Sequence, residues 1–296
     1  MANSLFFDVF FSASKEIYSH FVEVASYELG ATQETENDSG DSQKGMDILS
    51  NDILKERFAE KADELDLYGI MSEEDKEIIV INPAGSYVVA FDPLDGSTNI
   101  ASNLSCGSIL GVYKVNRDGN VLFTGDDIVL AGYSLYSQAL QIVWTNGDDV
   151  KMYQVDKNGE LAHPLDLKNH SVSKQKFGCV SGDCLVDDFD PFWLLCRLRF
   201  KDNDRMENYK NRWSGCMVAD VHRIVLSGGF FCYPGTVKTP NGKLRIWYEC
   251  LPMGMVIKAM GGHTTYGNDR IGYLQEGDFK LTDNYHLKFP VLLVRN

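Results

Sequence analysis

The sequence contains no long apolar run and comparatively few positive charges. Its 296 residues include no stretch of roughly 18 apolar residues, the length at which a membrane-spanning helix would be suspected. It carries 28 Lys and Arg against 42 Asp and Glu, which gives a formal net charge of −14. Because that charge repels polyphosphate and anionic headgroups, we expect no general binding to nucleic acid or to a membrane.

Paired cysteines and targeting signals are also missing from the sequence. There are seven cysteines, an odd number, and no Cys-x-x-Cys motif, so we expect free thiols in a reducing compartment. Residues 1–11 have neither the positive start of a secretory signal nor the arginines of a transit peptide. These features favour a cytoplasmic protein.

The pattern of apolar residues predicts two halves with different layouts. Residues 1–173 begin with two helices, separated by a polar loop at 31–45, and continue as short, mostly antiparallel strands. Residues 174–296 alternate helices and strands, which is typical of a layered α/β domain. The expected helices are 5–29, 47–65, 191–199, 217–227 and 252–260, and the expected strands of the second half are 229–233, 243–250 and 289–294.

The segment at 86–100, SYVVAFDPLDGSTNI, carries the strongest chemical signal. Its apolar strand runs into Asp92, and we expect Pro93 to end that strand because proline cannot donate to the ladder. Asp95 follows, and then a helix start at Ser97. Two carboxylates attract Mg²⁺ and free amides at a helix start attract phosphate, so a metal–phosphate site is predicted. The alternative is a local turn at Asp95 capped by Ser97.

Further acids precede this segment. Glu73 and Glu74 directly follow an apolar strand, where adjacent side chains point to opposite sides, so one could face a metal and the other a water. A solvated turn is the alternative. Asp47 stands where the second helix begins and could serve either the site or the helix as an N-cap.

The segment at 243–250, KLRIWYEC, combines cations with an acid. If it is a strand, one face carries Lys243, Arg245, Trp247 and Glu249, which suits a phosphate beside a metal. Ordinary charges on an edge strand are the alternative.

The turn at 240–242, PNG, would fold Tyr233 back toward Lys243, so that a phenol and an ammonium could grip one phosphate. Arg212 could add another cation. His222 lies in an apolar helical setting and is expected to be structural.

Taken together, these segments resemble one enzyme family. DILSND, MSEED, YVVAFDPLDGSTNI, RWSGCMVADVHR and YPGTVKTPNGKLRIWYEC are similar to segments of the fructose-1,6-bisphosphatase family, which includes sedoheptulose-1,7-bisphosphatase. The resemblance runs from about Asp41 to Leu293. DPLDGS is shared with inositol monophosphatases, whereas VADVHR and PNGKLR are specific to sugar bisphosphatases. The resemblance implies an α/β fold of stacked αβαβα layers with two mixed sheets.

The resemblance also implies roles for individual residues. Mg²⁺, as two or three ions and replaceable by Mn²⁺, would be held by Glu73, Asp92, the Leu94 carbonyl, Asp95 and Glu249. The attacking water would be activated by Asp47 and Glu74, with Asp41 on a loop that closes over the site. The 1-phosphate would lie against Gly96, Ser97 and Thr98, the distal phosphate against Arg212, Tyr233 and Lys243, and the sugar and 1-phosphate against Met217 and Arg245. Arg212 would come from a neighbouring subunit, so we expect a homodimer or homotetramer.

Departures from the family pattern bear on substrate and regulation. At 182–185, Trp213 and Gly254 the sequence departs from the pattern of the fructose enzyme. These departures would widen the pocket for a sugar one carbon longer, which favours sedoheptulose 1,7-bisphosphate. Fructose 1,6-bisphosphate is the alternative, because VADVHR and PNGKLR look closer to the fructose enzyme. An inositol-phosphate phosphatase and a non-catalytic sugar-phosphate or metal-binding protein are the remaining alternatives. Ser86 replaces a lysine of the family's AMP site, so we expect AMP not to inhibit.

Overall fold

The computed structural model describes residues 2–23, 32–36, 42–117, 119–172, 176–180, 209–268 and 272–295. Asp41, the segment at 182–185 and the helix expected at 191–199 lie outside these residues. None of the helices within the described ranges combines the length and the apolar character needed to cross a bilayer.

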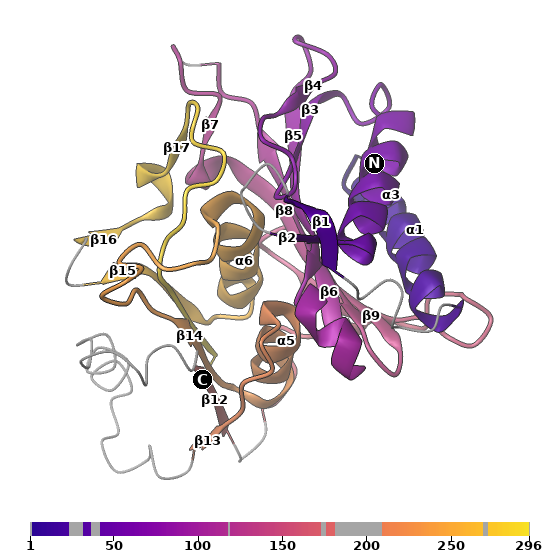
Figure 1. Cartoon of the computed structure of the whole chain (residues 1–296), viewed down its shortest axis with the longest axis vertical. Helices are drawn as coiled ribbons and strands as arrows, with labels where there is room; N and C mark the ends of the chain where they lie inside the picture. Colours follow the sequence, from indigo (N-terminus) through magenta and orange to yellow (C-terminus); the bar gives the residue numbers. More distant parts are fainter. Residues whose placement is uncertain are drawn as a thin grey trace.

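Two sheets and two pairs of helices form four alternating layers (Figure 1). Helices α1 (Ala2–Glu23) and α3 (Gly45–Glu60) cover one face of the larger sheet. Helices α5 (Met217–Ser227) and α6 (Leu251–Ala259) pack between its other face and the smaller sheet. The predicted α/β fold with two mixed sheets is therefore confirmed, and the described residues form four of the five layers expected in the αβαβα stack.

The larger sheet has the strand order β11-β10-β9-β8-β6-β5-β3-β4. Strands β3 and β5 run parallel, and the other neighbouring pairs in it are antiparallel. Its strands are β3 (Leu67–Ser72), β4 (Ile79–Val80), β5 (Tyr87–Asp95), β6 (Cys106–Lys114), β8 (Ile128–Tyr136), β9 (Leu140–Thr145), β10 (Val150–Gln154) and β11 (Leu165–Asp166).

The smaller sheet has the order β13-β12-β14-β18-β15-β16 and is also mixed. Strand β12 lies parallel to both of its neighbours, whereas β18 lies antiparallel to β14 and β15. Its strands are β12 (Lys176–Val180), β13 (Tyr209–Asn211), β14 (Gly229–Tyr233), β15 (His263–Asn268), β16 (Gly272–Leu274) and β18 (Val291–Arg295). Two further antiparallel pairs join β1 (Thr32–Glu36) to β2 (Ser42–Lys44) and β7 (Phe123–Thr124) to β17 (Lys280–Leu281).

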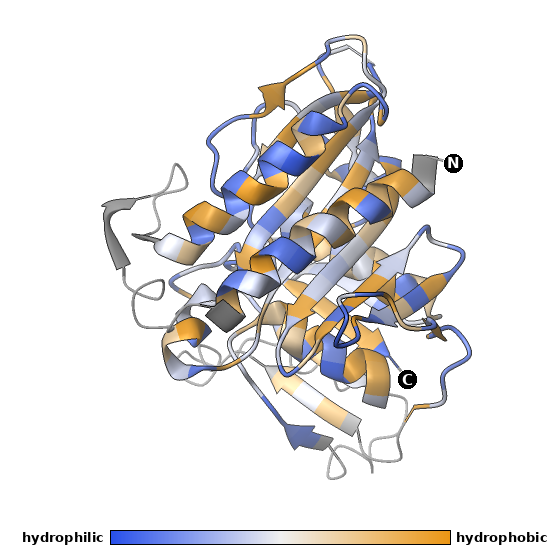
Figure 2. Cartoon of the chain, turned by 90° about the vertical axis from the view of Figure 1, so that its right-hand side faces the viewer, coloured by the Kyte–Doolittle hydropathy of each residue, from blue (hydrophilic) through white to orange (hydrophobic). Residues whose placement is uncertain are grey.

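Two apolar cores hold the layers together. On the outer side, the apolar residues of α1 recur every three or four positions, so Phe6, Phe10, Ala13 and Ile17 all face the sheet and are buried. Figure 2 shows α1 and α3 side by side across this face, each with hydrophilic residues toward solvent. The second core lies between the two sheets and includes Trp247. Burial of these large side chains is the main favourable contribution to folding.

The start of α3 differs from the sequence-based expectation. The helix begins at Gly45 and ends at Glu60, so Asp47 lies inside its first turn and does not occupy the N-cap position. Its side chain is buried. Part of the loop expected at 31–45 forms the antiparallel pair of β1 and β2.

The strand predicted at 243–250 is wrong. Residues Ile246–Cys250 form a π-helix that runs directly into α6. The amides of Glu249 and Cys250 both donate to the Arg245 carbonyl, at 3.1 and 3.2 Å, which winds the backbone into a helical turn. Lys243 is exposed whereas Arg245, Trp247 and Glu249 are buried, so the four side chains do not share one strand face. Alternating polarity indicated a strand here, but every residue from 244 to 250 is buried.

Gly254 makes a close packing contact in the core that tests this arrangement. A Cβ atom at this position of α6 would overlap the hydroxyl of Tyr266, which is buried and cannot easily move away. Gly254→Ala is therefore expected to lower the free energy of unfolding by about 1–3 kcal/mol, the cost of overpacking a core. Urea denaturation measures this change. Adding Tyr266→Phe should recover part of the loss, and a Gly254→Ala variant as stable as the wild type would contradict the packing.

Candidate active site

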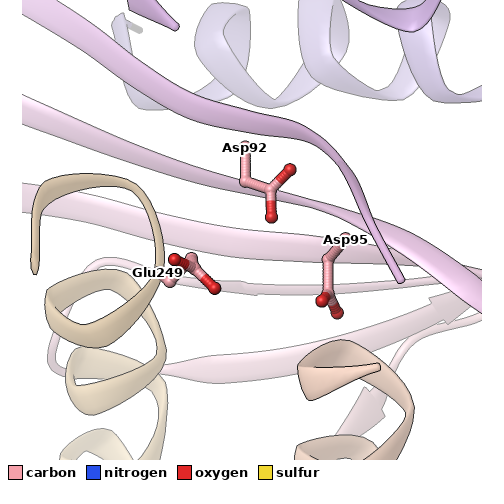
Figure 3. A group of neighbouring side chains, drawn as sticks. All are labelled: Asp92, Asp95 and Glu249. Atoms are coloured by element: carbon pink, nitrogen blue, oxygen red, sulfur yellow. The ribbon is translucent and has the colours of Figure 1, made fainter. Parts of the chain in front are cut away.

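Three buried carboxylates converge at one end of the larger sheet. Asp92, Asp95 and Glu249 each offer an oxygen within 4.8 Å of the others (Figure 3). Asp92 and Asp95 come from the end of β5, and Glu249 comes from the π-helix that precedes α6. Asp92 is 6% exposed and Glu249 is 4% exposed.

A bulge at the end of β5 brings its two aspartates together. The register between β5 and β6 shifts between Asp92 and Asp95, and Pro93 lies inside this irregularity. The expectation that Pro93 ends the strand is therefore wrong. A bulged residue is left unpaired in the ladder, so a proline, which has no amide hydrogen to donate, can occupy it. Ser108 donates to the Pro93 carbonyl at 2.7 Å, and the Leu94 amide donates to Asp92 Oδ1 at 2.9 Å.

Gly96 then turns the chain out of the sheet. Its φ of +76° is in the left-handed region, and a Cβ here would lie 2.6 Å from the Cβ of Cys216, so glycine is required at this position. The short 3₁₀ helix η1 (Ser97–Ser102) follows, with Gly96 as its N-cap and no side chain capping it. The alternative in which Ser97 serves as the cap is thus not what the structure shows. Ser97 is half-buried and Thr98 is exposed.

The start of α5 holds Asp95 in place. The Val218 amide donates to Asp95 Oδ2 at 2.6 Å, and the Cys216 thiol donates to the same oxygen at 3.0 Å. Cys216 is also the N-cap of α5, where its sulfur accepts from the Ala219 amide. A negative charge beside free amides at a helix start is favourable.

Arg245 contributes a buried positive charge next to the cluster. Its amide donates to Glu249 Oε2 at 2.6 Å, and its guanidinium forms an ion pair with Glu73 Oε1. The Glu73 amide also donates to the Phe91 carbonyl of β5 at 3.0 Å. Glu73 thus lies beside the cluster, with its carboxylate directed to Arg245.

Burial makes this cluster electrostatically unfavourable without a cation. It raises the pKa of Asp92 well above its usual range, and the nearby charges of Glu73, Asp95 and Glu249 raise it further. Burial likewise raises the pKa of Glu249 well above its usual value, although Arg245 opposes the shift. For Asp95, burial raises the pKa despite the hydrogen bonds from Val218 and Cys216. A hard divalent cation would relieve this repulsion, and three convergent carboxylates are the oxygen donors it prefers.

The carboxylates expected to activate water lie on two neighbouring elements. Asp47 is buried on α3, and Glu74 is half-buried just after β3. The Glu74 amide donates to Ser72 Oγ at 3.2 Å. Their proposed roles remain predictions, and Asp41 lies outside the described residues.

The residues expected to bind the distal phosphate lie on three separate segments, of which only β14, the strand of Tyr233, lies inside the smaller sheet. Tyr233 ends β14 and is half-buried, whereas Arg212 and Lys243 are exposed. The ring of Trp213 stacks on Phe231 at 5.8 Å and meets Tyr233 edge-on at 5.6 Å. Met217, the first residue of α5, is buried. Their roles toward a substrate also remain predictions.

His222 has the setting of a structural residue. It is buried in α5, where its Nδ1 lies 3.0 Å from the Tyr133 hydroxyl. Burial lowers its pKa to about 4. The ring is therefore neutral near pH 7, which agrees with the structural role expected from the sequence.

Sequence reasoning missed the groups that hold the carboxylates. From the sequence, Cys216 is expected to be a buried free thiol. Its contact with Asp95 joins two residues that are 121 positions apart in the chain. Its place immediately before the helix expected at 217–227 was the available signal, because a residue there lies beside the free amides of the first turn. Asn51, one helical turn after Asp47, was missed as well, and its side chain contacts Ser72 and Asp75 on either side of Glu73 and Glu74.

Comparisons with known proteins agree with this geometry. Family models described as fructose-1-6-bisphosphatase, N-terminal domain and C-terminal domain match residues 7–164 and 190–280. Fructose-1,6-bisphosphatase 1 of Bos taurus is 37% identical over 275 residues, covering 88% of this chain and 76% of its own length. Fructose-1,6-bisphosphatase class 1 of Campylobacter jejuni is 34% identical over 238 residues, covering 80% of this chain and 79% of its own.

A solved structure shows the same fold. The holo form of Leishmania major fructose-1,6-bisphosphatase superposes with a TM-score of 0.82 at 28% identity, covering 99% of this chain and 90% of that one. The carboxylate cluster, the layered fold and both family matches thus lead to one conclusion. The chain belongs to the fructose-1,6-bisphosphatase family, whose members are phosphatases that hydrolyse sugar bisphosphates.

Proposed function

We propose that this protein hydrolyses the 1-phosphate of fructose 1,6-bisphosphate in a Mg²⁺-dependent reaction. The observation that carries the proposal is the buried cluster of Asp92, Asp95 and Glu249 beside the turn at Gly96, in a chain of this family. Mn²⁺ could replace Mg²⁺, because both ions accept carboxylate oxygens in similar geometry. The proposal includes the division into a domain at 1–173 and a domain at 174–296.

The proposed metal ligands are the three clustered carboxylates together with Glu73 and the Leu94 carbonyl. Bound cations neutralise the phosphoryl oxygens and lower the pKa of a bound water. Glu73 would have to leave Arg245 to join them. Arg245 would then be released beside the 1-phosphate, where a guanidinium can bind two oxygens at once.

The remaining residues would position the substrate and move the proton. Asp47 and Glu74 would accept the proton of the attacking water as general bases, with Asp41 closing over the site. The turn at 96–98 would hold the 1-phosphate.

The distal phosphate would bind Arg212, Tyr233 and Lys243, with Met217 lining the sugar. The exposure of Arg212 and Lys243 is consistent with binding an anion at the surface. In the proposed homodimer or homotetramer, Arg212 would reach the site of a neighbouring subunit.

The choice of fructose over sedoheptulose rests on the relatives and on packing. The relatives named above are fructose-1,6-bisphosphatases. The glycine at 254 suggested a wider pocket in the sequence, but it leaves room for the Tyr266 hydroxyl that packs against it. Trp213 packs on Phe231 and Tyr233, so its ring serves local packing as well. The sequence-based preference for sedoheptulose 1,7-bisphosphate is therefore less well supported than its alternative, and 182–185 lie outside the described residues.

The first prediction from the proposed function concerns turnover. Glu249→Gln or Asp92→Asn should lower kcat for Mg²⁺-dependent phosphate release by more than ~10²-fold, the scale expected when transition-state charge stabilisation is lost. Phosphate release from fructose 1,6-bisphosphate measures this. The control is Glu64→Gln, which alters an exposed ion pair with Lys61 and should leave kcat unchanged. Near-normal turnover in both cluster variants would refute the assignment.

The second prediction concerns substrate preference. On one preparation, kcat/KM for fructose 1,6-bisphosphate should exceed that for sedoheptulose 1,7-bisphosphate by about 10-fold, equivalent to about 1.4 kcal/mol of differential transition-state binding. Both substrates are compared with the same Mg²⁺ concentration. Equal or reversed ratios would reject the proposed substrate while leaving the sugar-bisphosphatase assignment intact.

The third prediction concerns metal binding without turnover. A ligand present at 100 times its Kd stabilises a protein by about 2.7 kcal/mol, so saturating Mg²⁺ should raise the Tm of the wild type. The metal-free Glu249→Gln variant should be at least as stable as the metal-free wild type, because one repelling charge is gone. Its Tm should respond little to Mg²⁺, whereas Glu64→Gln should respond like the wild type. Equal Tm increases in all three proteins would place the ion elsewhere.

A further inference from the structure

A buried network joins α3 to the acidic turn at Ser72–Asp75. Ser72 Oγ donates to Asn51 Oδ1 at 2.6 Å and accepts the Glu74 amide at 3.2 Å. Asn51 Nδ2 in turn donates to Asp75 Oδ1 at 3.4 Å. Asn51 therefore holds both ends of this turn through one side-chain amide.

The network is shielded from water. Asn51 is 5% exposed and Ser72 is 1% exposed, so water cannot readily replace a broken hydrogen bond. Lys55 Nζ lies 3.1 Å from Asp75 Oδ1 and compensates its charge. From the opposite side, His286 Nε2 lies 3.0 Å from the Asp75 carbonyl oxygen. The turn is thus fixed to α3 and to the chain around residue 286.

The adjacent residues Glu73 and Glu74 are held by different partners. Glu73 is connected to the carboxylate cluster: its amide donates to the Phe91 carbonyl of β5, and its carboxylate forms an ion pair with Arg245. The Glu74 backbone is connected to α3 through Ser72 and Asn51. Asp47 lies on the same face of α3, because it precedes Asn51 by four residues. Asn51 therefore links the two elements that carry Asp47 and Glu74.

We propose that Asn51 is a positioning residue, which acts through Ser72 to set Glu74 relative to Asp47. This inference rests on the proposed function, in which these two carboxylates accept the proton of the attacking water. A general base must lie within hydrogen-bond reach of that proton, so a small displacement of the turn lowers the rate. The hydrogen bonds of Asn51 run to Ser72 and Asp75, neither of which is a proposed metal ligand.

Asn51→Leu and Ser72→Ala test the proposal by breaking the link from its two sides. Each variant should lower kcat about 10-fold, while KM for fructose 1,6-bisphosphate and the half-saturating Mg²⁺ concentration stay within about 2-fold. The double variant should lose no more than the worse single variant, because in the proposal Asn51 reaches Glu74 only through its hydrogen bond with Ser72. Ser72→Ala keeps the test valid if the bulkier change prevents folding.

The matched control is Ser50→Ala. Ser50 lies beside Asn51 on α3 and is buried, and its hydroxyl has no hydrogen-bond partner within the described part of the chain. Its loss should leave kcat unchanged. Hydrogen exchange gives a readout independent of activity: amides of a peptide spanning 72–77 should exchange faster in Asn51→Leu and Ser72→Ala, but not in Ser50→Ala.

Three outcomes would overturn the inference. If exchange accelerates but kcat matches that of Ser50→Ala, the link does not position Glu74. If the half-saturating Mg²⁺ concentration rises in step with the loss of kcat, Asn51 acts on the proposed metal ligands instead. If the wild type releases no phosphate with Mg²⁺, the proposed function fails and this role fails with it, whereas the first two outcomes refute the role of Asn51 alone.

Discussion

The repulsion among Asp92, Asp95 and Glu249 is the constraint on which the rest of the site depends. Each carboxylate is removed from water, and burial raises the pKa of each. Removal of like charges from water is unfavourable unless partners compensate them. The chain supplies partial compensation from two helix starts and from Arg245. A bound divalent cation would relieve the repulsion that remains, which supports the metal-dependent reaction proposed for the site.

This constraint explains why the layers meet where they do. Strand β5 supplies two carboxylates, the turn before α6 supplies the third, and α5 supplies the amide and thiol that hold Asp95. These elements belong to different halves of the sequence, and both helices lie between the two sheets (Figure 1). The packing of α5 and α6 therefore does more than fill a core. It sets the distances within the carboxylate cluster, so a change in that packing would also displace the proposed metal ligands.

Local regularities were predictable from the sequence, and the bends that build the site were not. The residues of α1 predicted a helix because their apolar positions follow the helical period, and the short continuous apolar run of β14 predicted a strand buried on both faces. Pro93 was misread because proline is excluded from a regular ladder but not from a bulge. The segment at 243–250 was misread because its residues alternate in polarity, although all from 244 onward are buried. The contacts of Cys216 with Asp95 and of Asn51 with Ser72 join segments far apart in the chain, which local patterns cannot specify.

A residue that departs from a family pattern need not mark a change of substrate. In the sequence, Gly254 suggested a pocket widened for a longer sugar. In the structure, its missing Cβ leaves room for the Tyr266 hydroxyl within the core. The same reasoning applies to Trp213, whose ring packs on Phe231. A core accommodates a change in one side chain by changing its neighbours, because interiors are packed as densely as crystals. Substrate preference should therefore be argued from side chains that contact the sugar, and Met217 and Arg245 are the proposed contacts among the described residues.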